Sequence, residues 1–189
     1  MKLIPTTLAF ASILALAGCA QEGAESTGAT AAQETTAAAP AEQAPALPEG
    51  FFLAEAPANA LTVSQARANA KAGDDIALTG YIGGRVEPFT EGRAIFLVAD
   101  SEVAPACTDA CAVPWDACCV PRDTIAANSA TIQVLDADGK TLKVDLKGQN
   151  GLEPGAEVTV VGKVREANES LLIVDASGIA ANGGGSATP

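Results

Sequence analysis

Alternation of apolar and polar residues is the clearest pattern in the chain, and a helix signal precedes it. Residues 62–65 read Thr-Val-Ser-Gln, which has the form of a capping box, where the first and fourth side chains each bond the other residue's backbone amide. With Gly73 as a stop signal, this pattern predicts one short helix over about 63–72. The residues from Ile76 to Ile82 then alternate with a period of two, which is typical of a half-buried strand.

Further runs of strand-forming residues follow along the chain. They occupy residues 93–99, 131–134, 141–147, 157–164 and 170–175. The third and fourth of the six segments flank Asp138-Gly139, a dipeptide that favours a hairpin turn because it tolerates positive φ. The last two segments predict another hairpin, with its turn at about residues 166–169.

Six short strands in so few residues fit a small closed barrel better than an open sheet, because an open sheet of this size leaves its edges exposed. Gly80, Gly83 and Gly84 would mark bends in such a barrel. The chain resembles the OB-fold in these respects. The predicted fold is all-β, with a five- to six-stranded OB-fold-like barrel, one short helix before it and a long cysteine-rich loop.

A narrower resemblance depends on the loop. Residues 114–119 read Pro-Trp-Asp-Ala-Cys-Cys, and the chain from about Thr62 to Ile179 resembles uncharacterised bacterial envelope proteins in which such a barrel carries a Pro-Trp-Asp-x-Cys-Cys loop. That resemblance implies a fold and an architecture but no particular activity.

The N-terminus has the pattern of an export signal. Lys2 precedes a mostly apolar stretch, residues 3–17, which ends in Leu-Ala-Gly-Cys at 16–19. A membrane-spanning helix needs about 20 apolar residues, whereas a secretory signal has an apolar core of about 7–15. The boundary resembles the lipobox of bacterial lipoproteins. The resemblance implies that residues 1–18 are removed, that Cys19 is acylated, and that the lipid bilayer is a partner.

The rest of the chain divides by composition. Residues 20–50 contain five glutamates, no basic residue and few large apolar side chains, so we expect residues 19–50 to form a lipidated, disordered acidic linker. The barrel domain is predicted over 51–180 and a disordered tail over 181–189. Lipoproteins kept in the inner membrane commonly have Asp after the lipidated cysteine, and here Ala20 stands there. Resemblance thus implies the outer membrane, facing the periplasm.

Charge and composition argue against several functions. The chain has 23 acidic residues, 11 basic residues and no histidine, for a net charge of −12. Nucleic acid is an improbable partner because phosphate backbones require clustered positive charge. Without histidine the chain lacks the commonest general base and metal ligand. We expect a non-catalytic binding or scaffolding protein without a cofactor, whose partner is an envelope protein or a glycan.

The long loop, about residues 101–129, contains Cys107, Cys111, Cys118 and Cys119. In an exported domain, four cysteines indicate two disulfides. Adjacent cysteines bridge each other only with strain, which leaves 107–118 with 111–119, or 107–119 with 111–118. A rival hypothesis is a four-cysteine site for zinc or copper in a metal-handling lipoprotein, although the spacing lacks paired C-x₂-C motifs. A redox-active pair is a third reading.

Aromatic residues suggest where a ligand could bind. Trp115 is the sole tryptophan, and we expect it to pack over a disulfide or cap the barrel, or alternatively to stack on a sugar ring or peptide. Tyr81, Phe89 and Arg93 would then lie near the same rim. Asp116 is interpreted as a turn residue that could also contact the ligand.

Overall fold

The computed structural model describes residues 46–104 and 111–182. The predicted signal peptide, the lipidated Cys19, most of the linker, Cys107 and nearly all of the C-terminal tail lie outside these ranges. The elements within them are β1 (Leu61–Thr62), α1 (Val63–Asn69), β2 (Asp75–Ile82), β3 (Ile95–Ala99), α2 (Arg122–Ala127), β4 (Ser129–Gln133), the 3₁₀ helix η1 (Gln149–Gly151), β5 (Glu157–Ala167) and β6 (Leu172–Ala181).

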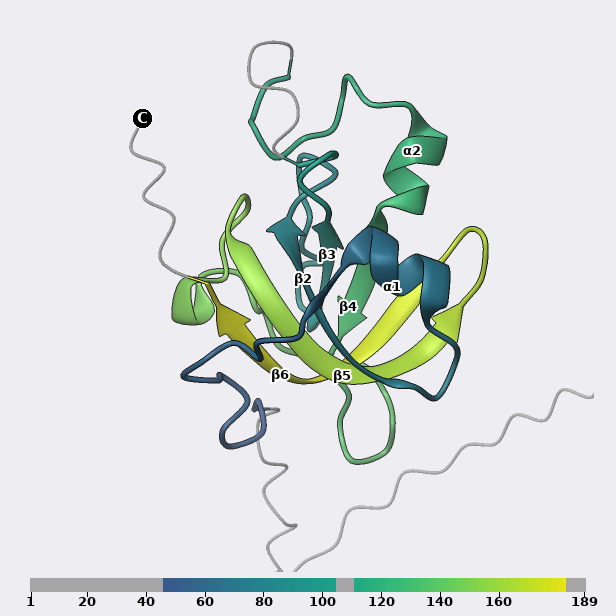
Figure 1. The fold of residues 1–189 in the computed structure, drawn as a ribbon. Coiled ribbons are helices and arrows are strands. Elements are labelled where there is room, and N and C mark those ends of the chain that lie inside the picture. The colour runs from purple at the N-terminus through teal and green to yellow at the C-terminus, as the bar shows by residue number, and fades with distance from the viewer. Residues whose placement is uncertain (1–45, 105–110, 183–189) are drawn as a thin grey trace, which may run out of the picture. The chain divides into compact units, whose positions relative to one another are not determined.

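Five of the strands close into a barrel. The sheet order is β1-β2-β3-β4-β6-β5, and an additional pairing of β5 with β2 closes the barrel and leaves β1 outside it (Figure 1). Within the barrel, β4 and β6 run parallel and the other pairs are antiparallel, while the short β1 adds to β2 in parallel. The predicted small all-β barrel with a short helix before it is confirmed.

The interior of the barrel follows the alternation in the sequence. In β2 the buried positions recur at every second residue, at Ile76, Leu78, Gly80 and Ile82. Apolar side chains from all five barrel strands and from α1 form one core. Its largest members with almost no exposed surface are Phe51, Phe96, Leu78, Ile82, Ile132, Leu146, Leu152, Leu172 and Ile179. Burial of this apolar surface is the main stabilising contribution to the fold.

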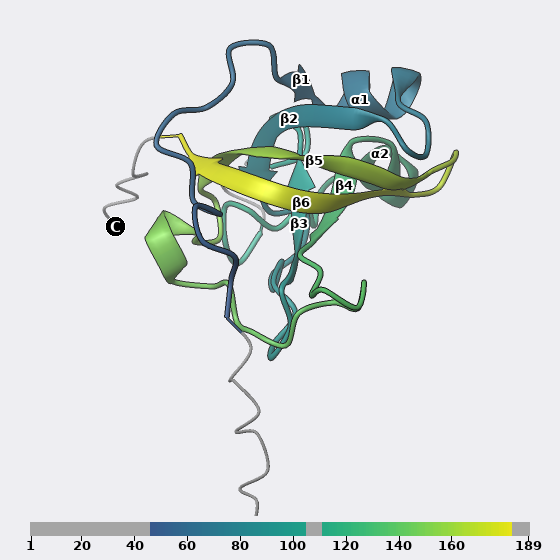
Figure 2. The same cartoon turned by 90° about the horizontal axis from the view of Figure 1, so that it is seen from below.

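The predicted capping box begins α1. The Thr62 hydroxyl accepts a hydrogen bond from the Gln65 amide at 3.2 Å, and the Gln65 side chain accepts one from the Thr62 amide at 3.1 Å. The helix ends at Asn69, earlier than the predicted end near 72, because Ala70 is already extended. Figure 2 shows α1 lying beside β2.

The hairpin of β5 and β6 is confirmed and is longer than predicted. Its turn is held by the Asn168 carboxamide oxygen, which accepts from the amides of Ser170 and Leu171, both at 2.9 Å. The register shifts twice, once between Val161 and Gly162. A Cβ placed on Gly162 would come within 2.9 Å of the Ala176 Cα, so the two strands approach too closely there for a side chain.

One predicted strand is absent. The turn at Asp138-Gly139 forms, but after it the segment 141–147 makes only one isolated bridge, between Leu135 and Thr141. The reason is that β4 already pairs with β3 on one side and β6 on the other, which leaves no ladder edge free. Leu142 and Leu146 are nevertheless buried, so the alternation correctly predicted which side chains face the core.

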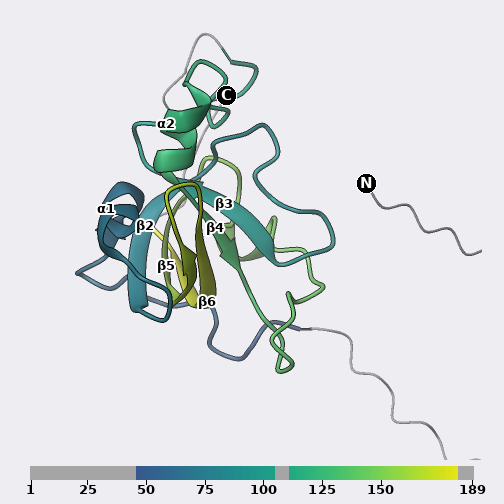
Figure 3. The same cartoon turned by 90° about the vertical axis from the view of Figure 1, so that its right-hand side faces the viewer.

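A second difference concerns the long loop. The predicted long loop, about residues 101–129, is the connection between β3 and β4, and it contains a helix that no sequence pattern predicted, α2, which lies beside the barrel (Figure 3). Within the described part of the chain, no helix has the length and apolar character needed to cross a membrane.

Candidate functional site

The connection between β3 and β4 is the feature that distinguishes this barrel from a minimal one. Its side chains form a small second core on the outer side of the sheet, built from Ala99, Val103, Ala104 and Ala117. Tyr81, Val120 and Ile125 pack against it. The described part of the connection therefore forms a second layer on the barrel.

Asp100 fastens the start of this connection to α1. Its carboxylate oxygens accept hydrogen bonds from the Val63 and Ser64 amides, both at 2.8 Å. The residue is 7% exposed, and a buried carboxylate is tolerated when such charge-assisted bonds satisfy it. No local pattern marks Asp100 in the sequence, because its hydrogen-bond partners are more than thirty positions away.

Trp115 holds the middle of the connection against the barrel. Its indole Nε1 donates to the Val86 carbonyl at 2.9 Å, and its own carbonyl accepts from the Gly84 amide at 2.8 Å. A Cβ on Gly155 would lie 3.4 Å from the indole ring, and a Cβ on Gly83 would lie 2.9 Å from the Trp115 carbonyl oxygen. Glycine at position 83 thus permits the close approach of the loop.

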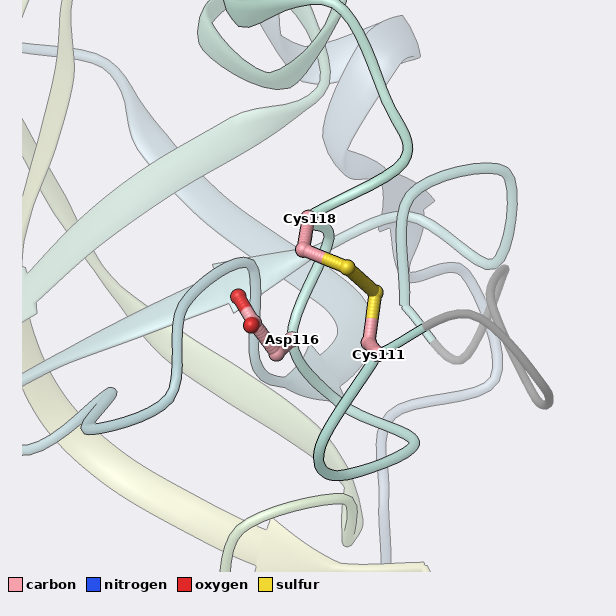
Figure 4. A group of neighbouring side chains, drawn as sticks. All are labelled: Cys111, Asp116 and Cys118. Atoms are coloured by element: carbon pink, nitrogen blue, oxygen red, sulfur yellow. A yellow bond between two sulfur atoms is a disulfide. The ribbon is translucent and has the colours of Figure 1, made fainter.

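The cysteines provide a covalent closure next to this tryptophan. Cys111 and Cys118 form a disulfide with a Cα–Cα distance of 5.7 Å and a sequence separation of 7 (Figure 4). This bond excludes the predicted pairing of 107–118 with 111–119. Cys119 is also disulfide-bonded. The remaining cysteine of the loop, Cys107, lies outside the described residues.

Asp116 lies beside the disulfide, and one of its carboxylate oxygens is within 4.8 Å of both sulfurs of Cys111 and Cys118 (Figure 4). Thiolate is the form of cysteine that binds metals. In the oxidised state shown here the two sulfurs are bonded to each other, so a metal site that included them would first require reduction of the disulfide.

The other three residues that were predicted to line a ligand rim do not come together in the structure. Tyr81 packs against the second core, whereas Phe89 packs against the main core, with its ring centroid 5.6 Å from that of Phe96. Arg93 is exposed. Trp115 makes no hydrogen bond or ring contact with any of the three within the described ranges.

A cleft of about 230 Å³ lies beneath α2. Its floor is the outer face of β3 and β4, including Leu97, Ser129 and Thr131, and α2 and the β5–β6 turn form its walls. Two arginines, Arg85 and Arg122, line it as well. None of these five residues belongs to a motif that the sequence displays.

The β5–β6 turn, which forms one wall of the cleft, is held in place by hydrogen bonds from α1. The Arg67 guanidinium donates to the carbonyls of Asn168 at 3.2 Å and Glu169 at 2.7 Å, and partial burial lowers the pKa of Arg67. The turn residue Ser170 is therefore held in a defined position at the cleft.

A second, larger hollow of about 410 Å³ is lined by Glu87, Phe89, Glu91, Asp145 and Lys147. Lys147 and Glu87 form an exposed ion pair at 3.5 Å, and the Asp145 carboxylate accepts from the Gly92 amide at 2.6 Å. These contacts pair Lys147, Glu87 and Asp145, while Glu91, the remaining charged residue of the hollow, is exposed to solvent.

Comparison of the chain with protein-family models, with curated proteins and with solved structures gives no significant match in any of the three.

Proposed function

We propose that this chain is a membrane-tethered, non-catalytic binding or scaffolding lipoprotein of the bacterial envelope. It is anchored through acylated Cys19, most simply at the outer membrane facing the periplasm, and its barrel presents the β3–β4 connection to an envelope protein or glycan. The lipobox-like Leu-Ala-Gly-Cys at 16–19 supports the anchor. The observation that carries the binding role is the second layer on the barrel.

The connection that forms this layer is much longer than the pairing of β3 with β4 requires. β3 and β4 are antiparallel neighbours, and such strands can be joined by a few residues. Here the connection runs from Asp100 to Asn128 instead. Ordering the described residues of the connection, 100–104 and 111–128, costs conformational entropy, which is offset by the second core, the Asp100 hydrogen bonds, the Trp115 contacts and the disulfide. Connections of this length are uncommon and usually functional unless they are disordered, and the order of the described part lowers the entropic cost of binding.

Crosslinking in the native envelope tests the binding role. A photo-crosslinking amino acid placed at Ala126, an exposed α2 residue at the cleft, should give one or a few discrete adducts. The matched control is Ser177, an exposed position on β6, which should give none. Absence of adducts from Ala126, or the same adducts from both positions, would contradict a binding face on the connection.

A second function, metal handling, is favoured by one observation only, the proximity of Asp116 to Cys111 and Cys118. Thiol counting under denaturing, non-reducing conditions, with elemental analysis of the natively exported chain, distinguishes the two functions. Zero free thiols and no metal would reject a thiolate site. About one zinc or copper ion per chain, lost on chelation together with order in the loop, would replace the disulfide hypothesis with the metal one.

A further inference from the structure

The cleft beneath α2 has an electrostatic character opposite to that of the rest of the chain. Acidic residues outnumber basic ones by 23 to 11 overall, yet the charged residues that line the cleft are Arg85 and Arg122, without any carboxylate. The arginines come from two separate segments, the β2–β3 connection and α2. Their convergence on one cleft creates a local positive potential within an acidic protein.

Neither guanidinium group is paired with another residue in the part of the chain that the structure describes. Arg165 pairs with Asp175 at 2.8 Å, and Arg67 donates to two backbone carbonyls. Arg85 and Arg122, in contrast, are exposed, and their side chains have no hydrogen-bond or ion-pair partner within residues 46–104 and 111–182. Their guanidinium groups are therefore available for a ligand.

The floor of the cleft supplies an independent observation. Ser129 is 8% exposed and lines the cleft, and its hydroxyl is buried without a hydrogen-bond partner in the described structure. Buried polar groups are rarely left unpaired, because an unmade hydrogen bond costs free energy. Ser129 belongs to the outer face of β4, the face that α2 covers, so a ligand in the cleft could supply the missing partner.

We propose that the cleft beneath α2 binds a small ligand through a carboxylate or phosphate group. The oxyanion accepts hydrogen bonds from the Arg85 and Arg122 guanidinium groups and from the Ser129 hydroxyl. The guanidinium fork matches the geometry of both groups. This inference rests on the proposed binding function, for which it names the chemical class of the ligand.

The remaining lining residues restrict the ligand further. Leu97, Ile125 and Leu171 give the cleft an apolar part beside the arginines. The volume of about 230 Å³ is below the range of roughly 300–1,000 Å³ for drug-sized ligands. The site therefore accommodates one oxyanion with a few attached carbon atoms, either as a small molecule or as the end of a larger one.

Binding to the full-length chain, purified from native membranes in a non-ionic detergent, tests the proposal directly. Isothermal titration with inorganic phosphate, glycerol phosphate, acetate and butyrate should show saturable binding of at least one probe. Preference for the two phosphates or for the two carboxylates identifies the anionic group, and tighter binding of butyrate than of acetate would locate the carbon atoms on the apolar wall. No saturable binding of any of the four probes would overturn the proposal.

Two double variants separate a site from a general charge effect. Arg85→Gln with Arg122→Gln should weaken binding at least about tenfold, because charge-assisted hydrogen bonds are lost. The control, Arg93→Gln with Lys143→Gln, removes the same charge from exposed residues away from the cleft and should leave the affinity unchanged. Equal weakening by both variants would overturn the proposal.

A third measurement needs no variant of the arginines. Phenylglyoxal labels exposed arginines, and the bound probe should protect Arg85 and Arg122 in the unaltered chain while Arg93 stays reactive. Equal protection of all three, or of none, would contradict the site. If crosslinks from Ala126 form but no oxyanion binds, the binding function stands and only this inference fails.

Discussion

Replacing Asp100 by alanine tests how the β3–β4 connection is joined to the barrel. The carboxylate accepts two amide hydrogen bonds of 2.8 Å from Val63 and Ser64. Its backbone also takes part, because the Val103 and Ala104 amides donate to the Asp100 carbonyl at 2.8 and 2.9 Å. Alanine keeps this backbone arrangement and removes only the two side-chain acceptors.

The expected loss follows from these contacts. A hydrogen bond to a charged group contributes about 1.5–3 kcal/mol net. After truncation the Ser64 amide can turn to water because Ser64 is exposed, whereas Val63 is fully buried. We therefore expect Asp100→Ala to lower the free energy of unfolding by about 3 kcal/mol, toward the lower end of the sum. Asp100→Asn keeps one acceptor and should lose less.

Urea denaturation of the full-length chain in detergent measures this loss. Trp115, the sole tryptophan, lies on the same connection and reports its unfolding by fluorescence. Glu55→Ala is the control, since Glu55 is exposed and has no partner among the described residues; it should shift stability by less than about 0.5 kcal/mol. A loss for Asp100→Ala as small as that of the control would refute the assigned role of the carboxylate.

Three further results are expected. Cys19→Ser should abolish acylation and release the chain from the membrane fraction, and normal processing with membrane retention would contradict the lipoprotein hypothesis. Gly162→Ala should lower the unfolding midpoint in a thermal scan, because a Cβ would meet the backbone of β6 within 2.9 Å; an unchanged midpoint would argue against that close approach. Cys111→Ser with Cys118→Ser should cost about 2–3 kcal/mol while the far-ultraviolet circular dichroism stays that of a β protein, and collapse of that spectrum would show that the barrel depends on the loop.

Local sequence patterns were sufficient to predict most elements of the barrel. Strand alternation and the capping box each involve residues a few positions apart, so the sequence displays them directly. The interior positions Ile76, Leu78 and Ile82 follow from period two alone. The hairpin of β5 and β6 is also a local feature, since its turn is closed by the Asn168 side chain.

Features that depend on distant partners were not predictable in this way. The segment 141–147 has strand periodicity, but whether it forms a strand depends on a free edge that β4 does not have. Asp100 resembles any loop aspartate until α1 is placed beside it. The cleft joins Arg85, Arg122 and Ser129, which come from three separate segments and form no motif. For α2, six residues without a side-chain cap gave too weak a signal.

The contacts of the β3–β4 connection fall into two groups, those around the disulfide and those that form the cleft. The Cys111–Cys118 disulfide closes a ring with a sequence separation of 7, which contains Trp115 and so constrains how the indole meets Val86 and Gly84. The cleft is formed by other elements. Its floor consists of β3 and β4, and its walls are α2 and the β5–β6 turn, which Arg67 holds. No residue within that ring lines the cleft. The ring therefore fixes one part of the face, while α2 and the β2–β3 connection position Arg122 and Arg85. This division explains how the fold can carry a cysteine-rich loop and a basic cleft side by side: the disulfide constrains the segment around Trp115, whereas the cleft depends on α2 and on the turn held by Arg67.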